Sequence, residues 1–215
     1  MNVLLDNLGL YGGAFLGTIE LFVVAAIGSL IWGTILAAMR VSPVPVLRSF
    51  GTAYVNILRN TPLTLVFFFW AFAYPRLDIL DLSFFARACL ALIVYTSAFV
   101  CETVRSGVNT VPVGQAEASR ALGFGFTQTL SQIVLPQAMR AVVPPLTNVQ
   151  IALLKNTTIA AGFSVFEAGG IYQTLSERGY NVLIGLLWVA LGFLILVAPL
   201  TALQRSLERS WSVAR

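Results

Sequence analysis

The chain has 215 residues, of which 58% are hydrophobic and only 10% charged, and its mean hydropathy is +0.85. Soluble domains carry about 25% charged residues, so this composition excludes an ordinary water-soluble domain. Histidine is absent, which removes histidine-based nucleophilic chemistry and histidine zinc sites. The only lysine, Lys155, does not lie in a glycine-rich phosphate-binding loop. We expect a membrane protein that is not an enzyme, has no metal or cofactor of its own and binds no nucleic acid.

Five apolar stretches approach the length of about 20 residues that a bilayer-spanning helix needs. They cover residues 14–38, 57–74, 84–103, 142–163 and 182–203. The fourth stretch is the most diluted by polar side chains. The pattern predicts one all-α membrane domain over residues 1–215 with five transmembrane helices.

The arginines predict how these spans are oriented. Cytoplasmic loops of membrane proteins are enriched in arginine and lysine. With the amino terminus outside, nine arginines are cytoplasmic: Arg40, Arg48, Arg59, Arg105, Arg120, Arg140, Arg205, Arg209 and Arg215. Three arginines and the lysine then fall on the outer side: Arg76, Arg87, Arg178 and Lys155. We therefore predict a multi-pass protein of the plasma membrane, surrounded by lipid, with its amino terminus outside.

The longest predicted cytoplasmic segment covers residues 106–140. Pro112 is suited to begin a short helix over residues 113–122, and Gly123 is suited to end it. A second short helix is predicted over residues 127–134, stopping before Pro136. The first helix has small side chains that let another surface approach closely. These residues alone leave two interpretations open, a docking element for a partner or an ordinary amphipathic connector.

The spacing within this segment resembles a known loop. Glu117-Ala118-Ser119, then Gly123 and Ile133-Val134-Leu135-Pro136, resembles the "EAA" loop of permease subunits in ATP-binding cassette importers. Ser119 in place of the second alanine is a small-for-small departure. Residues 59–63 (RNTPL) and 95–107 resemble segments of the branch that transports polar amino acids. The resemblance extends over residues 18–205, nearly the whole chain.

The resemblance implies a type I importer transmembrane fold that forms half of a translocation pathway. A second permease subunit would complete the pathway, with a sister permease favoured over a second copy. Two cassette ATPase subunits would bind ATP and magnesium, and an extracellular solute-binding protein would deliver the substrate. The loop over residues 113–136 would couple the chain to the ATPase through five residues: Glu117, Ala118, Ser119, Arg120 and Gly123.

The resemblance also implies a polar amino acid as substrate. The overall likeness is greatest to permeases of glutamate importers from high-GC Gram-positive bacteria. The polar break in the fourth span supplies candidate pathway residues, Lys155, Asn156, Thr157 and Thr158. An acidic amino acid has two carboxylates, and arginine is their usual bidentate partner.

Ionisable groups are costly within a membrane span, and this makes Arg87, Glu20 and the pair Glu102 and Arg105 notable. Arg87 is a candidate substrate contact, but it can equally snorkel to the interface or pair with Asp81 or Glu20. For Glu20 two interpretations are open, a packing pair with an arginine from another span or a role in transport. Glu102 and Arg105, three residues apart, are predicted to form a structural pair.

A secondary transporter or channel subunit for a polar solute remains an alternative, because polar breaks in spans suit both. Secondary carriers usually contain internal repeats within a longer chain. Five spans in 215 residues without a clear repeat fit a half-pathway subunit better. Co-purification with a cassette ATPase separates the two interpretations.

Overall fold

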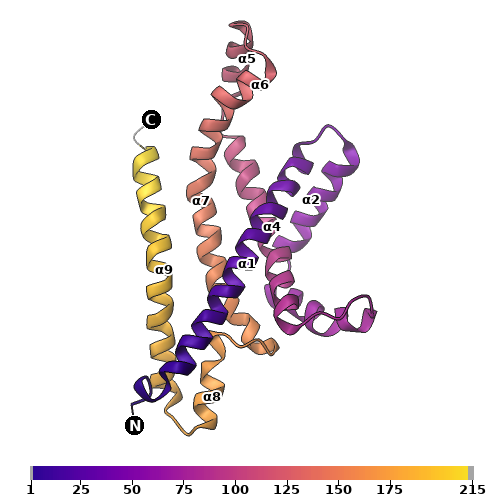
Figure 1. Cartoon of the computed structure of the whole chain (residues 1–215). Helices are drawn as coiled ribbons and strands as arrows, with labels where there is room; N and C mark the ends of the chain where they lie inside the picture. Colours follow the sequence, from indigo (N-terminus) through magenta and orange to yellow (C-terminus); the bar gives the residue numbers. More distant parts are fainter. Residues whose placement is uncertain (1, 213–215) are drawn as a thin grey trace.

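The computed structural model describes residues 2–212, and every regular element in that range is helical. Three helices are each long and apolar enough to cross a membrane. They are α1 (Leu8–Val41), which follows a 3₁₀ turn over Leu5–Asn7, α4 (Phe84–Val108) and α9 (Val182–Ser212) (Figure 1). These helices contain the predicted first, third and fifth spans. Arg215, which we assigned to the cytoplasmic side, lies outside the described residues.

The second predicted span, residues 57–74, is not one helix. Helix α2 (Pro45–Arg59) and the helical stretch Leu63–Leu77 are bent by 106° relative to each other. Pro62 lies between them with an extended backbone (φ −59°, ψ 136°). A proline lacks the N–H that a helix needs and disfavours helix in the residue before it, so α2 ends ahead of Pro62. The stretch after Pro62 consists of α3 (Leu63–Phe68), a π-helical turn (Phe69–Ala73) and a 3₁₀ turn (Tyr74–Leu77).

The fourth predicted span lies in a longer helical rod. The rod runs through α6 (Phe126–Gln128), a π-helical turn (Thr129–Val134), α7 (Leu135–Asn156) and a 3₁₀ segment (Thr157–Phe163). The prediction of a separate helix that stops before Pro136 is therefore wrong. A π-helical turn is wider than an α-helical one, so the ring of Pro136 fits where it would otherwise press on the carbonyl of residue 132.

After this rod the chain bends by 51° into a short segment formed by a 3₁₀ turn (Ala168–Gly170) and α8 (Ile171–Glu177). By length and composition, the described residues therefore hold three helices that could each span a membrane, or up to five spans if each bent pair counts as one. Helices α5 (Val113–Ala121) and α6 lie at the same end of the molecule as the end of α9, whereas the start of α1 and α8 lie at the opposite end (Figure 1).

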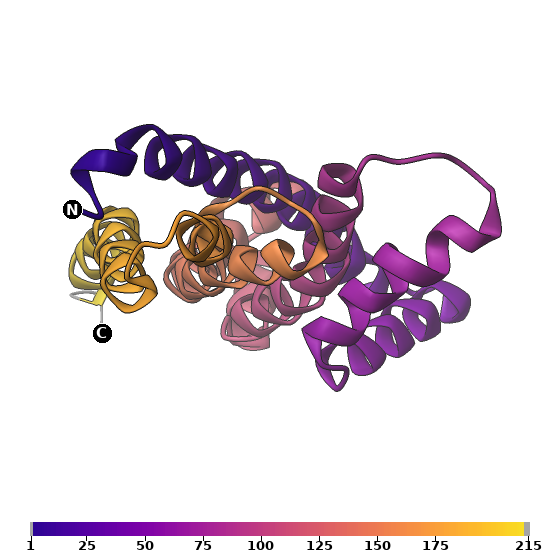
Figure 2. The same ribbon diagram turned by 90° about the horizontal axis from the view of Figure 1, so that it is seen from below.

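Helix α4 packs against both α1 and α7 and forms the centre of the molecule, and the view in Figure 2 shows the helices side by side around it. Glycines allow α1 and α4 to cross closely: a Cβ on Gly33 would lie 2.6 Å from Cβ of Val100. Small residues at such crossings are typical of helix packing in membranes. The largest core cluster joins α1, α3, α4 and α7 and includes Leu21, Phe67, Leu92 and Leu153.

Candidate functional site

A cavity of about 310 Å³ opens between α4 and α7. Its lining residues on α4 are Tyr95, Thr96 and Phe99, and those on α7 are Asn148, Val149, Ala152, Leu153 and Asn156. The α7 residues Asn148, Ala152 and Asn156 are spaced four apart and therefore share one helix face. Two facing helices thus place aromatic rings opposite amide groups.

The polar groups of this cavity suit a small polar ligand. Thr96 is only 3% exposed, and its Oγ1 has no hydrogen-bond partner among the described residues. A buried hydroxyl without a partner is costly, so a ligand or water in the cavity would relieve that cost. The amides of Asn148 and Asn156 each offer both donors and an acceptor. The cavity can therefore bind a molecule with several polar groups along an aromatic wall.

The structure separates the four polar residues of the predicted break in the fourth span. Asn156 lines the cavity, whereas Lys155 is exposed. Thr157 is fully buried and donates to the carbonyl of Leu154 at 2.7 Å, and Thr158 donates to the carbonyl of Lys155 at 2.8 Å. The α-helix changes to 3₁₀ at Thr157, so these neighbours point in different directions.

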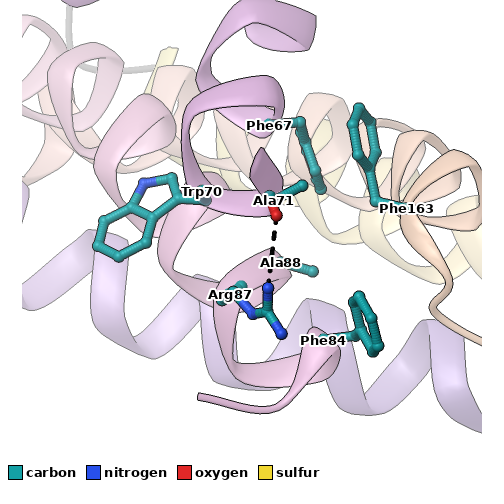
Figure 3. A pocket seen from close by; sticks show the side chains of 7 residues that line it. All are labelled: Phe67, Trp70, Ala71, Phe84, Arg87, Ala88 and Phe163. Carbon is teal, nitrogen blue, oxygen red and sulfur yellow. Dashed lines mark hydrogen bonds between the residues drawn. The ribbon is translucent and has the colours of Figure 1, made fainter. Parts of the chain in front are cut away.

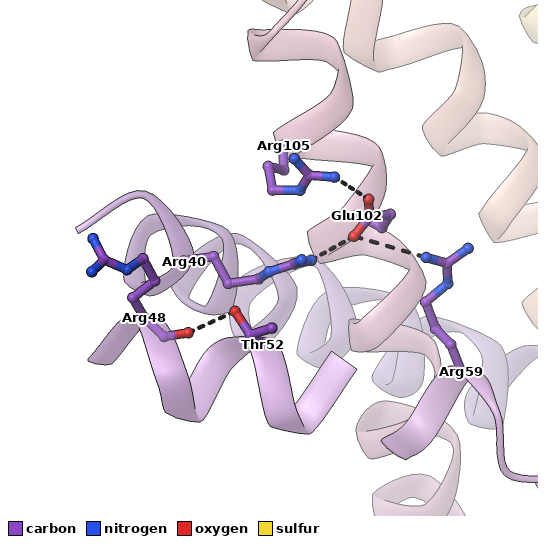
Figure 4. Close-up of polar contacts among 6 residues, drawn as sticks. All are labelled: Arg40, Arg48, Thr52, Arg59, Glu102 and Arg105. Carbon is purple, nitrogen blue, oxygen red and sulfur yellow. Dashed lines mark hydrogen bonds and ion pairs between the residues drawn. The ribbon is translucent and has the colours of Figure 1, made fainter. Parts of the chain in front are cut away.

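A cluster of charges lies near the end of α4 that leads to α5, around the carboxylate of Glu102 (Figure 4). Arg105 from the same helix contacts Oε1, and Arg40 from α1 contacts Oε2 at 2.5 Å. Arg59, the last residue of α2, lies 3.8 Å from Oε2. The structure thus brings together the pair predicted from the sequence and adds Arg40 and Arg59, which the sequence analysis did not connect to it.

Arg87 is held by backbone groups near the start of α4 (Figure 3). Its Nε donates to the carbonyl of Leu82 at 2.9 Å, and its Nη1 lies 3.4 Å from the carbonyl of Ala71. The guanidinium also lies over the ring of Phe84, 4.6 Å from the centroid. These contacts join the start of α4 to the connector before it and to the π-helical turn Phe69–Ala73, and they give Arg87 a structural role on the side of the molecule away from α5.

Two acidic residues lie where α1 meets the segment between the rod and α8, Glu20 on α1 itself and Glu167 just before the 3₁₀ turn Ala168–Gly170. Glu20 is exposed and lines a second cavity of about 330 Å³ beside Ser164 and Phe166. Glu167 is fully buried, and its Oε2 accepts a hydrogen bond from Thr18 at 3.3 Å. Thr18 and Glu167 are 149 residues apart along the chain, so no local sequence pattern indicates this contact.

The loop helix α5 forms the tip of the molecule beyond α4 and α7 (Figure 1). Its helix is confirmed over Val113–Ala121, and Gly123 follows with φ +88°, a left-handed conformation that favours glycine. Glu117, Ala118, Arg120 and Gly123 are exposed. Leu122 and Phe126 beside them are 80% and 70% exposed, so the tip presents apolar and charged groups together.

Ser119, which departs from the resembled motif, points inward. It is 4% exposed, and its hydroxyl lies 2.9 Å from Oγ1 of Thr129 on the π-helical turn. This hydrogen bond holds α5 against the helical rod that contains α7. Ser119 therefore stabilises the tip from its buried side, whereas the other four predicted coupling residues are exposed.

No group of three or more histidine, cysteine, aspartate or glutamate side chains that could hold a metal ion occurs in residues 2–212.

The comparisons with known proteins agree with these features. Residues 29–213 match the family model described as binding-protein-dependent transport system inner membrane component. The chain is 50% identical over 199 residues to the glutamate transport system permease protein GluC of Corynebacterium efficiens, covering 87% of each chain. It is 36% identical over 218 residues to the probable glutamine ABC transporter permease protein GlnM of Bacillus subtilis, covering 98% of this chain and 99% of that one.

A solved structure shares the fold. The crystal structure of an amino acid ABC transporter with histidines superposes with a TM-score of 0.90 at 22% identity and covers 96% of both chains. An inward-facing structure of the MetNI methionine ABC transporter gives a TM-score of 0.78 at 20% identity. The match to the family model covers well over half of the residues, so the chain belongs to the family of inner membrane components of binding-protein-dependent transport systems, the permease subunits of ATP-binding cassette importers.

Proposed function

We propose that this permease subunit imports an acidic amino acid, glutamate, through a half-pathway that includes the cavity between α4 and α7. The observation that carries the proposal is the 50% identity to a glutamate transport permease over most of both chains. The cavity supports it, because the buried hydroxyl of Thr96 and the amides of Asn148 and Asn156 can bind the polar groups of an amino acid. Of the predicted pathway residues, Asn156 has the strongest support.

The partners follow from the family. A permease subunit of this kind is non-catalytic and works with ATPase subunits, a further permease and a substrate-binding protein. We infer two cassette ATPase subunits, which bind ATP and magnesium. We also infer a sister permease in preference to a second copy, because importers in the branch that the sequence resembles commonly pair two diverged permeases. The subunit composition of the purified complex tests both inferences.

The coupling contact is assigned to the tip formed by α5. Glu117, Ala118, Arg120 and Gly123 are exposed there, and Leu122 and Phe126 add apolar surface. Such a mixed patch suits a groove on an ATPase subunit, since interfaces combine an apolar centre with polar neighbours. Ser119 contributes from within by fastening α5 to Thr129. ATP-driven movement of the ATPase subunits would then shift the pathway between inward-open and outward-open states.

We propose five spans, with the amino terminus outside and α5 in the cytoplasm. The two bent helix pairs each count as one span in this topology. Support comes from the described ends of the chain, which lie at opposite ends of the molecule, and from α5, which shares its end with the end of α9 (Figure 1). The nine cytoplasmic arginines support the same orientation.

Uptake by the complete transporter in proteoliposomes tests the proposed function. With ATP inside and binding protein outside, labelled glutamate should accumulate, and it should not do so when the ATPase is inactivated by substitution. Accumulation without ATP would favour the secondary transporter or channel. Asn156→Ala, which alters the cavity, is compared with Lys155→Ala, which alters an exposed neighbour. A larger effect of the lysine substitution would contradict the assignment of the pathway to this cavity.

A further inference from the structure

Arg59 is the least engaged of the three arginines around Glu102. Arg40 and Arg105 each contact one oxygen of the carboxylate closely, whereas Nη1 of Arg59 is 3.8 Å from Oε2. Its side chain is also the most exposed of the three, 44% against 12% for Arg40 and 32% for Arg105. The guanidinium of Arg59 therefore has N–H donors that the cluster does not use (Figure 4).

Arg59 is also the member of the cluster that lies beside the cavity. Its Cζ is 5.8 Å from the ring centroid of Phe99, and Phe99 lines the cavity together with Asn148 and Asn156. The ring of Phe99 thus contacts both the guanidinium of Arg59 and the cavity. Arg59 is the last residue of α2 and directly precedes the bend between α2 and α3.

The net positive charge of the cluster around Glu102 favours the binding of an anion. Three guanidiniums surround one carboxylate, which leaves two positive charges in excess. A carboxylate that moves along the cavity toward this end approaches that excess charge, and arginine can bind it with two parallel hydrogen bonds. Glutamate carries a net charge of −1 and glutamine none, so the excess positive charge of the cluster attracts glutamate more strongly than glutamine.

We propose that Arg59 binds a carboxylate of the transported amino acid at the end of the cavity nearest Glu102, and that this contact selects an acidic over a neutral amino acid. Glu102 is then the counter-charge that the substrate carboxylate replaces. This proposal rests on the proposed function, because it assumes that an amino acid passes through the cavity. It adds a specificity-determining residue outside the cavity lining.

Direct binding to the permease–ATPase complex without its solute-binding protein tests the role of Arg59, because selectivity then reflects the membrane subunits. Labelled glutamate and glutamine are titrated against the unaltered complex and the Arg59→Gln, Arg59→Lys and Arg48→Gln variants. Arg48 is the matched control: it is an exposed arginine on the same helix. We expect Arg59→Gln to weaken glutamate binding about tenfold or more and glutamine binding by less than about threefold, since the lost hydrogen bonds involve a charged group. We expect Arg48→Gln to leave both unchanged.

Several results would overturn the proposal. Equal weakening of both amino acids by Arg59→Gln, no weakening of either, or the same selective loss in Arg48→Gln would each do so. Glutamate binding too weak to measure in the unaltered complex would do so as well. If Arg59→Gln fails to assemble, Arg59→Lys decides, because it keeps the charge: a retained preference for glutamate supports the proposal, and a lost preference overturns it. Failure of ATP-dependent uptake by the unaltered transporter would instead count against the proposed function.

Discussion

The crossing of α1 and α4 at Gly33 leaves no room for even one methyl group. A Cβ at this position would lie 2.6 Å from both Cβ and Cγ1 of Val100 and 2.8 Å from the carbonyl oxygen of Ser97. Carbon atoms pack best at about 3.5–4.0 Å, so Gly33→Ala requires the two helices to separate by roughly 1 Å. Overpacking of this kind costs about 1–3 kcal/mol, which is roughly 5- to 150-fold in the folding equilibrium.

Thermal unfolding of the purified complex in detergent, followed by size-exclusion chromatography of the heated samples, measures this effect. Gly12→Ala is the control on the same helix, because a Cβ there has no neighbouring atom within 4 Å. Alanine should stabilise a helix by about 0.5–1 kcal/mol relative to glycine in that position, so the two variants should shift the melting temperature in opposite directions. Val100→Ala removes the clashing Cγ1 methyl group but keeps Cβ, so it should restore part of the stability when it is combined with Gly33→Ala.

Two results would refute the steric argument. One is a Gly33→Ala protein as stable as the unaltered protein. The other is a double variant whose loss equals the sum of the two single losses, because residues in contact should instead show a coupling energy of about 0.5–3 kcal/mol.

Three further predictions concern transport and topology. Glu117→Lys reverses the charge of the exposed tip, so it should lower ATP-dependent uptake while membrane content on immunoblots stays unchanged; normal uptake would contradict the coupling role. Arg87→Ala removes the contacts to the carbonyls of Leu82 and Ala71, so it should speed proteolysis of the connector before α4 and leave the substrate concentration for half-maximal uptake unchanged; a rise in that concentration would instead indicate substrate contact. Reporter fusions should read external at the amino terminus and cytoplasmic at the carboxyl terminus, and the reverse pattern would contradict the topology.

The sequence predicted the long helices well because hydrophobic length alone defines them. Helices α1, α4 and α9 contain the three most continuous apolar stretches. The second span was predicted as one helix because apolar residues lie on both sides of Pro62, but the backbone bends there by 106°. The opposite error occurred at Pro136, where a proline indicates a helix end but a π-helical turn lets the rod continue. Hydropathy depends only on side-chain polarity and therefore does not report these effects on the backbone.

The candidate site was less predictable because its parts come from different helices. Asn156 was identified from the polar break, but Thr96 and Asn148 became candidates only when α4 and α7 were seen to face each other. The regular spacing of Asn148, Ala152 and Asn156 was a readable signal for a shared face. The contacts of Glu102 with Arg40 and Arg59 bridge 62 and 43 residues along the chain, and no local pattern indicates them.

The excess positive charge around Glu102 also has a consequence in an energised membrane. Moving one elementary charge across the membrane changes its free energy by about 2.3 kcal/mol for each 100 mV. With α5 in the cytoplasm and the inside negative, the potential opposes any outward displacement of the two net charges that Arg40, Arg59 and Arg105 leave around Glu102. Because these side chains come from α1, α2 and α4, an outward displacement of any of these three helix ends would move part of this charge against the potential.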